Sequence, residues 1–393
     1  MRDDSRQVRE ASVFELSGEQ RAAVESFRRY AEKRLRPLGD DYEKRGTPPS
    51  REETIKLFRE IGEFGLLGAL VSDADGGSGI GMMGLALFTE EIARNWTGFG
   101  FTVAIQAAGA GLVSALGTPE QKARMLPPML AGELIGCMAI SEPGVGSNVA
   151  EVKTRAVEDG DRFVVSGQKL WISNGDISDF VIAVVRTGDA ELSYVIVDRA
   201  AGYTTRPVAK MALHSTFTSE VFFDGIRIPK ANLLGERGKG LKQTVKLFER
   251  PRTLLCMCAV GLAQDALDQA IEYAKVRVQH GKVIAGHQTI QNYLAEMATD
   301  IHAARLLGLR AAAMIDRDER CDMEAAMAKY FGPEMAVRAT SKALQIHGGF
   351  GVTEEYRVSR LFREARIIPI PDGTTEIQKL IIGRALTGVN AFS

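Results

Sequence analysis

The hydrophobic pattern of this sequence changes twice along the chain, and the order of the changes most narrows the folds it can adopt. Residues 19–135 carry apolar side chains at helical spacing, as in QRAAVESFRRYAEKRL. From residue 136 to about 235, short apolar runs alternate with Asp-Gly and Ser-Gly pairs, which is typical of antiparallel hairpins. Long helical patterns return beyond Gly240. This order excludes a doubly wound sheet and predicts a mainly α protein with a central β domain between helical bundles.

Length and charge support a multidomain protein without a nucleic-acid partner. A chain of 393 residues can bury two or three ordinary cores, and we expect domains at 1–135, 136–240 and 241–393. The formal net charge is −1, from 49 basic and 50 acidic residues, and neither sign forms a long run. A nucleic-acid-binding face would need a basic cluster.

The remaining composition predicts a cytoplasmic protein without metal or membrane span. The first residues, MRDDSRQVREASVF, lack the apolar core of a secretory signal. Charges or glycines interrupt the longest apolar runs before they reach the length of a membrane span. The four cysteines form no disulfide framework, and C-M-C within a helical pattern is not metal-ligand spacing.

Two glycine-rich stretches carry different weight as cofactor motifs. GIGMMG (79–84) matches GxGxxG, but no βαβ unit surrounds it, so we interpret it as a loop before a helix. AISEPGVGSNVAEV (139–152) follows an apolar strand and exposes N–H and hydroxyl groups suited to a flavin or phosphate, although a plain hairpin loop also explains it. Thirty residues on, KLWISNG adds a tryptophan that either belongs to the core or covers an aromatic cofactor.

The stretch IPIPDGTTEIQ (368–378) holds one aspartate between a proline and a glycine. Proline restricts its own φ and favours extended conformations in the preceding residue, so we predict a stiff segment that ends in a turn. A helical pattern follows, and Asp372, Thr374 and Thr375 are all suitable N-caps. Helix capping therefore explains this aspartate as well as catalysis does.

These motifs occur together and in a fixed order, and the chain thereby resembles the acyl-CoA dehydrogenase family over nearly its whole length. The resemblance rests on AISEPGVGSN, LWISNG, FERPRTLLCMCAVGLAQDALDQAIEYAKVR, RVQHGKVIAGHQTIQ, QIHGGFGV and REARIIPIPDGTTEIQKLIIGR. It implies an N-terminal helical domain, a middle β-barrel-like domain and a C-terminal four-helix bundle. It also implies FAD between the domains, an acyl-CoA substrate, a homotetramer and electron-transfer flavoprotein as electron acceptor.

The resemblance assigns cofactor contacts position by position. The strand through Met138, Ile140 and Ser141 is expected along the flavin ring, with the Ser141 hydroxyl near N5. The other implied FAD positions are Gly146 and Ser147 at the diphosphate, Trp171 and Ser173 beside the flavin, Arg277, Gln279 and His280 at the adenosine half where subunits meet, Gln345 and Gly349 across the dimer, and Thr374 and Glu376 after the catalytic loop.

The resemblance also puts Asp372 at the position of the catalytic base, which is usually glutamate. The base takes the α-proton of the thioester while the β-hydrogen leaves as hydride to flavin N5. The thioester carbonyl is expected to accept hydrogen bonds from a flavin ribityl hydroxyl and from the base's own backbone N–H, which stabilise the enolate. The implied substrate positions are Glu91, Gly100, Ser147, Arg252, Pro371 and Gly373.

The chain departs from the family pattern at several of these positions. Asn148 stands where aspartate is common, Pro371 where tyrosine is common, and Pro251 where some relatives carry the base on the long helix. Aspartate is one methylene shorter than glutamate, and a shortfall of about 1 Å can cost about a hundredfold in rate. A ring at the α-carbon would fill the gap, and cyclic acyl-CoA dehydrogenases resemble this chain in using aspartate as base.

The sequence therefore predicts oxidation of cyclohexane-1-carboxyl-CoA or a related cyclic acyl-CoA. Gly100 replaces an arginine found with dicarboxylic chains, so a distal carboxylate has no partner there. Glu91 offers a second acid for a 1,4-elimination to a cyclic diene. The alternatives are a short straight- or branched-chain acyl-CoA dehydrogenase, an acyl-CoA oxidase-like or catalytically altered flavoprotein of the same fold, and a helical scaffold without cofactor.

Overall fold

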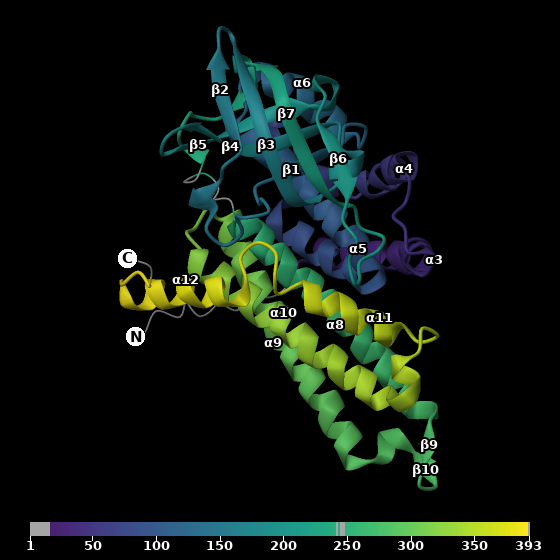
Figure 1. Cartoon of the computed structure of the whole chain (residues 1–393). Coiled ribbons are helices and arrows are strands. Elements are labelled where there is room, and N and C mark those ends of the chain that lie inside the picture. Colours follow the sequence, from purple (N-terminus) through teal and green to yellow (C-terminus); the bar gives the residue numbers. More distant parts are fainter. Residues whose placement is uncertain (1–15, 241–242, 244–247, 392–393) are drawn as a thin grey trace.

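The computed structural model describes residues 16–240, 243 and 248–391 (Figure 1). Helices form the first and last parts of the chain and strands form the middle, which confirms the predicted fold class. The segment MRDDSRQVREASVF and most of LKQTVK, at the start of the last helical pattern, lie outside the described residues.

The first helical region begins its helices where the sequence provides caps. Ser17, Ser50 and Thr118 each form a capping box, in which the side chain accepts from the N3 backbone N–H. Pro119 occupies the first position of its helix. The elements are α2 (Gly18–Tyr30), a π-helical segment (Ala31–Leu35), α3 (Arg36–Arg45), α4 (Arg51–Gly62), α5 (Gly81–Leu116) and α6 (Pro119–Leu130).

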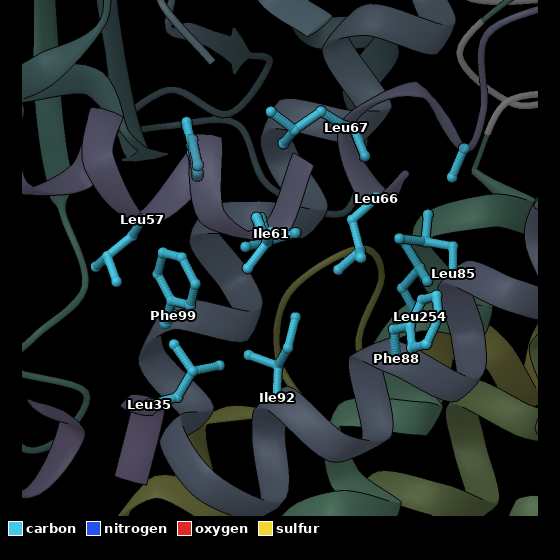
Figure 2. Packing of buried hydrophobic residues seen from close by; sticks show 14 of the residues in the cluster. Leu35, Leu57, Ile61, Leu66, Leu67, Leu85, Phe88, Ile92, Phe99 and Leu254 are labelled. Carbon is cyan, nitrogen blue, oxygen red and sulfur yellow. The ribbon is translucent and has the colours of Figure 1, made fainter. Parts of the chain in front are cut away.

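The apolar faces of these helices meet around α5, which is kinked at Trp96 (Figure 2). Leu57 and Ile61 of α4 are buried together with Phe99 of α5. Leu254 joins the same cluster from the C-terminal region, so one core connects the two helical parts of the chain. Burial of each large side chain contributes about 1.5–3 kcal/mol.

The middle region forms one sheet in the order β6-β7-β3-β2-β4-β5-β8, with β1 parallel to β4. The Asp-Gly pair at 159–160 makes the predicted turn between antiparallel β2 and β3. The Ser-Gly pair at 166–167 does not end a strand, which corrects the hairpin expectation: it is a bulge within β3. The strands are β1 (Gly136–Ala139), β2 (Arg155–Asp159), β3 (Arg162–Ser173), β4 (Phe180–Gly188), β5 (Glu191–Asp198), β6 (Thr204–Pro207), β7 (Thr218–Pro229) and β8 (Leu233–Leu234).

The last region is a bundle of long helices. Helix α8 packs against α5, α9 and α10, and α11 and α12 pack on α10. By length and composition α5 and α8 could each cross a membrane, contrary to our expectation of no such run, but 67% and 78% of their most apolar windows are buried in the fold. The elements are α8 (Glu249–Val276), β9 (Val278–Gln279), β10 (Lys282–Val283), α9 (Gln288–Asp316), α10 (Asp322–His347), a 3₁₀ segment (Gly348–Val352), α11 (Arg357–Ile367) and α12 (Thr375–Thr387).

The GIGMMG stretch is a turn that opens α5. Gly79 and Gly81 have left-handed φ values of 70° and 65°. The Asp316 carboxylate accepts from the backbone N–H groups of Met82 (2.6 Å) and Met83 (2.8 Å), so it caps α5 from α9. A Cβ on Gly81 would lie 2.7 Å from Asp316 Oδ1. Gly81 therefore allows a cap between distant helices, and the stretch is a loop before a helix, as interpreted from the sequence.

Candidate active site

Asp372 lies on a short loop between α11 and α12 whose backbone is held in disfavoured conformations. Ile368 ends α11 with φ −59° and ψ −33°, although proline follows and disfavours this helical region. Asp372 itself has a left-handed φ of 56°. The segment thus forms turns, and the predicted extended conformation was wrong. The reason is tertiary: Lys329 of α10 donates from Nζ to the carbonyl oxygens of Ile368 (3.1 Å) and Pro369 (2.9 Å).

Two further side chains hold the second half of this loop. Gln378 of α12 is fully buried and donates from Nε2 to the carbonyl oxygens of Asp372 (3.2 Å) and Gly373 (2.9 Å). Arg252 of α8 approaches the Asp372 carbonyl oxygen with Nε at 3.5 Å. Residues from α8, α10 and α12 therefore converge on the backbone around one aspartate.

The Asp372 carboxylate is not the helix cap. Thr374 is the N-cap of α12, and its Oγ1 accepts from the N–H of Ile377 at 3.5 Å. Burial raises the pKa of the Asp372 carboxyl, while the positive charges of Lys329 and Arg252 oppose that rise. A carboxylate made more basic by burial and kept ionisable by cations has the properties of a general base.

The glycine turn and the tryptophan strand lie side by side, as expected for two sides of one cofactor site. The N–H of Leu170 donates to the Ser141 carbonyl oxygen at 2.9 Å. A register shift between Lys169 and Ile172 gives Trp171 a left-handed φ of 67°, and its side chain is 56% exposed. Open space surrounds Gly146. An exposed indole beside an open glycine turn suits a flat aromatic cofactor with a phosphate.

A buried ion pair between Lys169 and Glu142, which the sequence reasoning missed, holds the start of this turn. Lys169 Nζ donates to Glu142 Oε1 and to the Ile140 carbonyl oxygen, both at 2.9 Å. Glu142 also accepts from the backbone N–H groups of Lys153 and Thr154. Burial lowers the pKa of Lys169 to about 8. The pair fixes the strand that leads into Ser141.

A second group of predicted residues lines an open groove of about 780 Å³ near β9 and β10. Arg277, Gln279, His280 and Gly349 all line it. The exposed Gln345 is not among the lining residues, so the structure does not bring it into the groove. The β9–β10 end of α8 lies away from α12 (Figure 1), whereas Arg252, which approaches Asp372, is near the start of α8. About 25 helical residues between Arg252 and Arg277 correspond to about 37 Å.

Other predicted positions are distributed around these two centres. The Glu91 carboxylate pairs with Arg28 of α2, with Oε1 2.6 Å from Nη2, so a protein cation already engages this acid. Gly100 is buried in α5, and a Cβ there would lie 3.5 Å from Cys258 Sγ. Of the remaining positions, Met138, Ile140, Ser173 and Pro371 are partly buried, whereas Ser147, Asn148 and Glu376 are exposed.

The sequence did contain a signal for Lys329, which our reasoning missed. This lysine stands within a stripe of small residues in MEAAMAKYFGP that includes Ala325, Ala328 and Gly332. All three are buried, and Lys329 is fully buried with them. A single cation on the apolar face of a helix is costly unless it has acceptors, so it indicates a buried partner.

Removal of a proton from one carbon becomes a dehydrogenation only when an electron acceptor takes the hydrogen of the neighbouring carbon as hydride. A carboxylate that acts as a base and a surface that suits a flat aromatic cofactor are together what a flavin-dependent oxidoreductase requires. Family models for the N-terminal, middle and C-terminal domains of acyl-CoA dehydrogenases match residues 17–133, 137–226 and 238–387, respectively. The chain belongs to the acyl-CoA dehydrogenase family.

Individual relatives cover nearly the entire chain. It is 37% identical to "Probable acyl-CoA dehydrogenase YngJ" of Bacillus subtilis, over 95% of this chain and 99% of the relative. It is 34% identical to cyclohexane-1-carbonyl-CoA dehydrogenase of Geobacter metallireducens, again over 95% and 99%. A glutaryl-CoA dehydrogenase of Mycobacterium smegmatis in complex with FADH2 superposes with a TM-score of 0.90 at 28% identity, over 96% of this chain and 97% of that one.

The enzyme is FAD-dependent, and its residues fit that cofactor. The open turn at Gly146 and the exposed indole of Trp171 suit the diphosphate and the flavin. In the groove, Gly348 and Gly349 border open space, and the Arg277 guanidinium lies 5.8 Å from the Phe350 ring centroid. A cation and an exposed ring suit an adenine with its phosphates.

We expect Arg277→Ala to weaken FAD retention at least tenfold, because a hydrogen bond from a charged group contributes about 1.5–3 kcal/mol. The fraction of bound flavin after dilution measures this, and size-exclusion chromatography checks whether subunit contacts weaken as well. Lys275→Ala is the control, since Lys275 forms an exposed pair with Glu272 on the same helix. Full flavin occupancy and an unchanged oligomer in Arg277→Ala would contradict the assignment.

Proposed function

We propose that this enzyme dehydrogenates an acyl-CoA thioester between its α- and β-carbons with Asp372 as the catalytic base. The observation that carries the proposal is a partly buried aspartate on a loop whose backbone is anchored by Lys329, Arg252 and Gln378. Thr374 already caps the following helix, which leaves the carboxylate free for chemistry.

The residues of this chain account for the proton transfer. Asp372 removes the α-proton, and burial makes its carboxylate a stronger base. Its own backbone N–H donates to the thioester carbonyl, as the family resemblance implies, and so stabilises the developing enolate. The anchored loop keeps base and donor in fixed relation, which matters because a misplacement of about 1 Å can cost about a hundredfold in rate. FAD, when bound, accepts the hydride from the β-carbon.

The substrate that we propose is cyclohexane-1-carboxyl-CoA, oxidised to the cyclohex-1-ene thioester. The short aspartate and Pro371, which stands in place of a bulkier aromatic, favour a ring at the α-carbon, and Gly100 in place of an arginine disfavours a dicarboxylic chain. Similarity to the Geobacter metallireducens cyclohexane-1-carbonyl-CoA dehydrogenase supports the same substrate. The ion pair of Glu91 with Arg28 argues against Glu91 as a second acid, so we propose 1,2- and not 1,4-dehydrogenation.

The proposed partners follow the family resemblance: electron-transfer flavoprotein as electron acceptor, a homotetramer and a cytoplasmic location. The separation of about 37 Å along α8 between Arg252, near Asp372, and Arg277, in the groove, supports the oligomer. A groove so far from Asp372 serves best as the adenosine site for the FAD of a neighbouring copy.

We expect cyclohexane-1-carboxyl-CoA to exceed butyryl-CoA and octanoyl-CoA in kcat/KM by about tenfold, the scale on which pocket shape discriminates apolar groups. Steady-state rates with an electron acceptor, over a panel of straight, branched and cyclic thioesters, measure this. A faster reaction with butyryl- or octanoyl-CoA would select the short-chain alternative. Rapid reoxidation in air with peroxide release would select the oxidase-like alternative.

A further inference from the structure

The buried cation Lys329 has no assigned part in the reaction, yet it lies directly behind the catalytic loop. Its side chain is fully buried in α10 and donates to two carbonyl groups, those of Ile368 and Pro369. Burying an ammonium group without need is costly, so the contacts must offset a large desolvation penalty. A neutral side chain of the same length would pack in this site without that penalty.

The two carbonyl groups belong to the part of the loop with the least favourable backbone. Ile368 is helical directly before a proline, and the chain turns within four residues to the left-handed Asp372. Lys329 is the hydrogen-bond donor that joins α10 to the start of this turn. Its contacts therefore determine where the turn begins and how Asp372 is presented.

The charge of Lys329 acts on the same carboxylate. Lys329 and Arg252 are the cations that oppose the effect of burial on the pKa of Asp372. Burial is the main cause that lowers the pKa of Lys329 to about 8, and Arg252 acts in the same direction. Asp372, Glu334 and the Cys256 thiol act in the opposite direction and favour the charged lysine. Lys329 is thus one of two cations whose charge acts on the Asp372 carboxyl.

We propose that Lys329 is a positioning residue for the proposed base: its ammonium group fixes the turn that presents Asp372 and supplies positive charge on that side of the loop. This inference rests on the proposed role of Asp372. Lys329 contacts neither substrate nor flavin in this assignment. It acts through the loop, which distinguishes it from the base.

The test compares FAD-loaded Lys329→Met, Lys329→Arg and the wild type in anaerobic flavin reduction by the fastest acyl-CoA of the panel. In Lys329→Met the limiting rate at pH 7 is expected to fall at least tenfold, while the half-saturating thioester concentration changes about twofold at most. Removal of a nearby cation raises the pKa of a carboxyl, so the acidic limb of the pH–rate profile should move up by about one pH unit or more. Lys329→Arg retains the charge and should restore the position of that limb.

A readout independent of activity tests the positioning role. Amide hydrogen exchange in residues 368–373 is expected to be at least tenfold faster in Lys329→Met than in the wild type. Lys342→Met is the matched control, because Lys342 lies on the same helix and pairs with Glu296 at the surface; neither exchange nor reduction should change. If Lys329→Met does not fold, Lys329→Gln, which keeps a donor without the charge, takes its place in the comparison with Lys329→Arg.

The outcomes separate the two proposals. A wild type whose flavin no thioester reduces overturns the proposed function. A wild type that is reduced normally, together with a Lys329→Met protein with unchanged rate, pH limb and exchange, overturns only the role of Lys329. If the acidic limb of the pH–rate profile lies at the same pH in Lys329→Arg as in Lys329→Met, the charge of Lys329 makes no contribution.

Discussion

Replacing Asp372 with asparagine is expected to lower the rate of flavin reduction by acyl-CoA by at least about a hundredfold, the usual scale for loss of a general base. Asparagine tolerates the left-handed backbone about as well as aspartate, so the loop should keep its conformation at φ 56°. FAD and acyl-CoA binding should therefore persist. Stopped-flow reduction measures the loss, and flavin absorbance together with ligand titration measures the binding.

Asp318→Asn is the matched control for this experiment. Asp318 also has a left-handed φ, of 51°, but it is exposed in the turn between α9 and α10. The same chemical change there should leave flavin reduction at the wild-type rate. Near-normal reduction by Asp372→Asn would mean that another acid is the base, and Glu91 and Glu376 would be the next to test.

Replacing Gly261 with alanine is expected to destabilise the protein by about 3 kcal/mol, the upper part of the usual range for overpacking. Gly261 lies in α8 where that helix crosses α5, and a Cβ there would be 2.1 Å from the Glu90 carbonyl oxygen and 2.9 Å from the Arg94 nitrogen. Both are backbone atoms, so no side chain can rotate away and the two helices must separate. The denaturation midpoint of the FAD-loaded protein measures this cost.

Gly383→Ala provides the contrast on another helix. Gly383 lies within α12, and its Cβ would meet no atom within 4 Å. Alanine is the better helix former by up to about 1 kcal/mol, so this variant should be as stable as the wild type or slightly more so. Equal stability of Gly261→Ala and the wild type would mean that α5 and α8 are not packed as closely as described.

Local patterns predicted most of the architecture because they depend on neighbouring residues. Ser50 and Thr118 begin helices through capping boxes, and both boxes can be read directly from the sequence. The turn at Gly160 follows from an Asp-Gly pair between two apolar runs. The Ser-Gly pair at 166–167 misled us, because the close approach of Thr154 to Gly167 makes a bulge where the local pattern suggested a turn.

For the candidate active site, too, the sequence predicted some features and only the tertiary structure decided others. The sequence by itself determined the family and the aspartate between proline and glycine, but it left three N-cap candidates open, and the structure decided for Thr374. Only the tertiary structure decided that the loop turns instead of extending, because the anchors Lys329, Arg252 and Gln378 come from three helices. It likewise decided that Glu91 pairs with Arg28. Contacts between residues far apart in the chain depend on how the helices pack against one another. A local sequence pattern does not specify that packing.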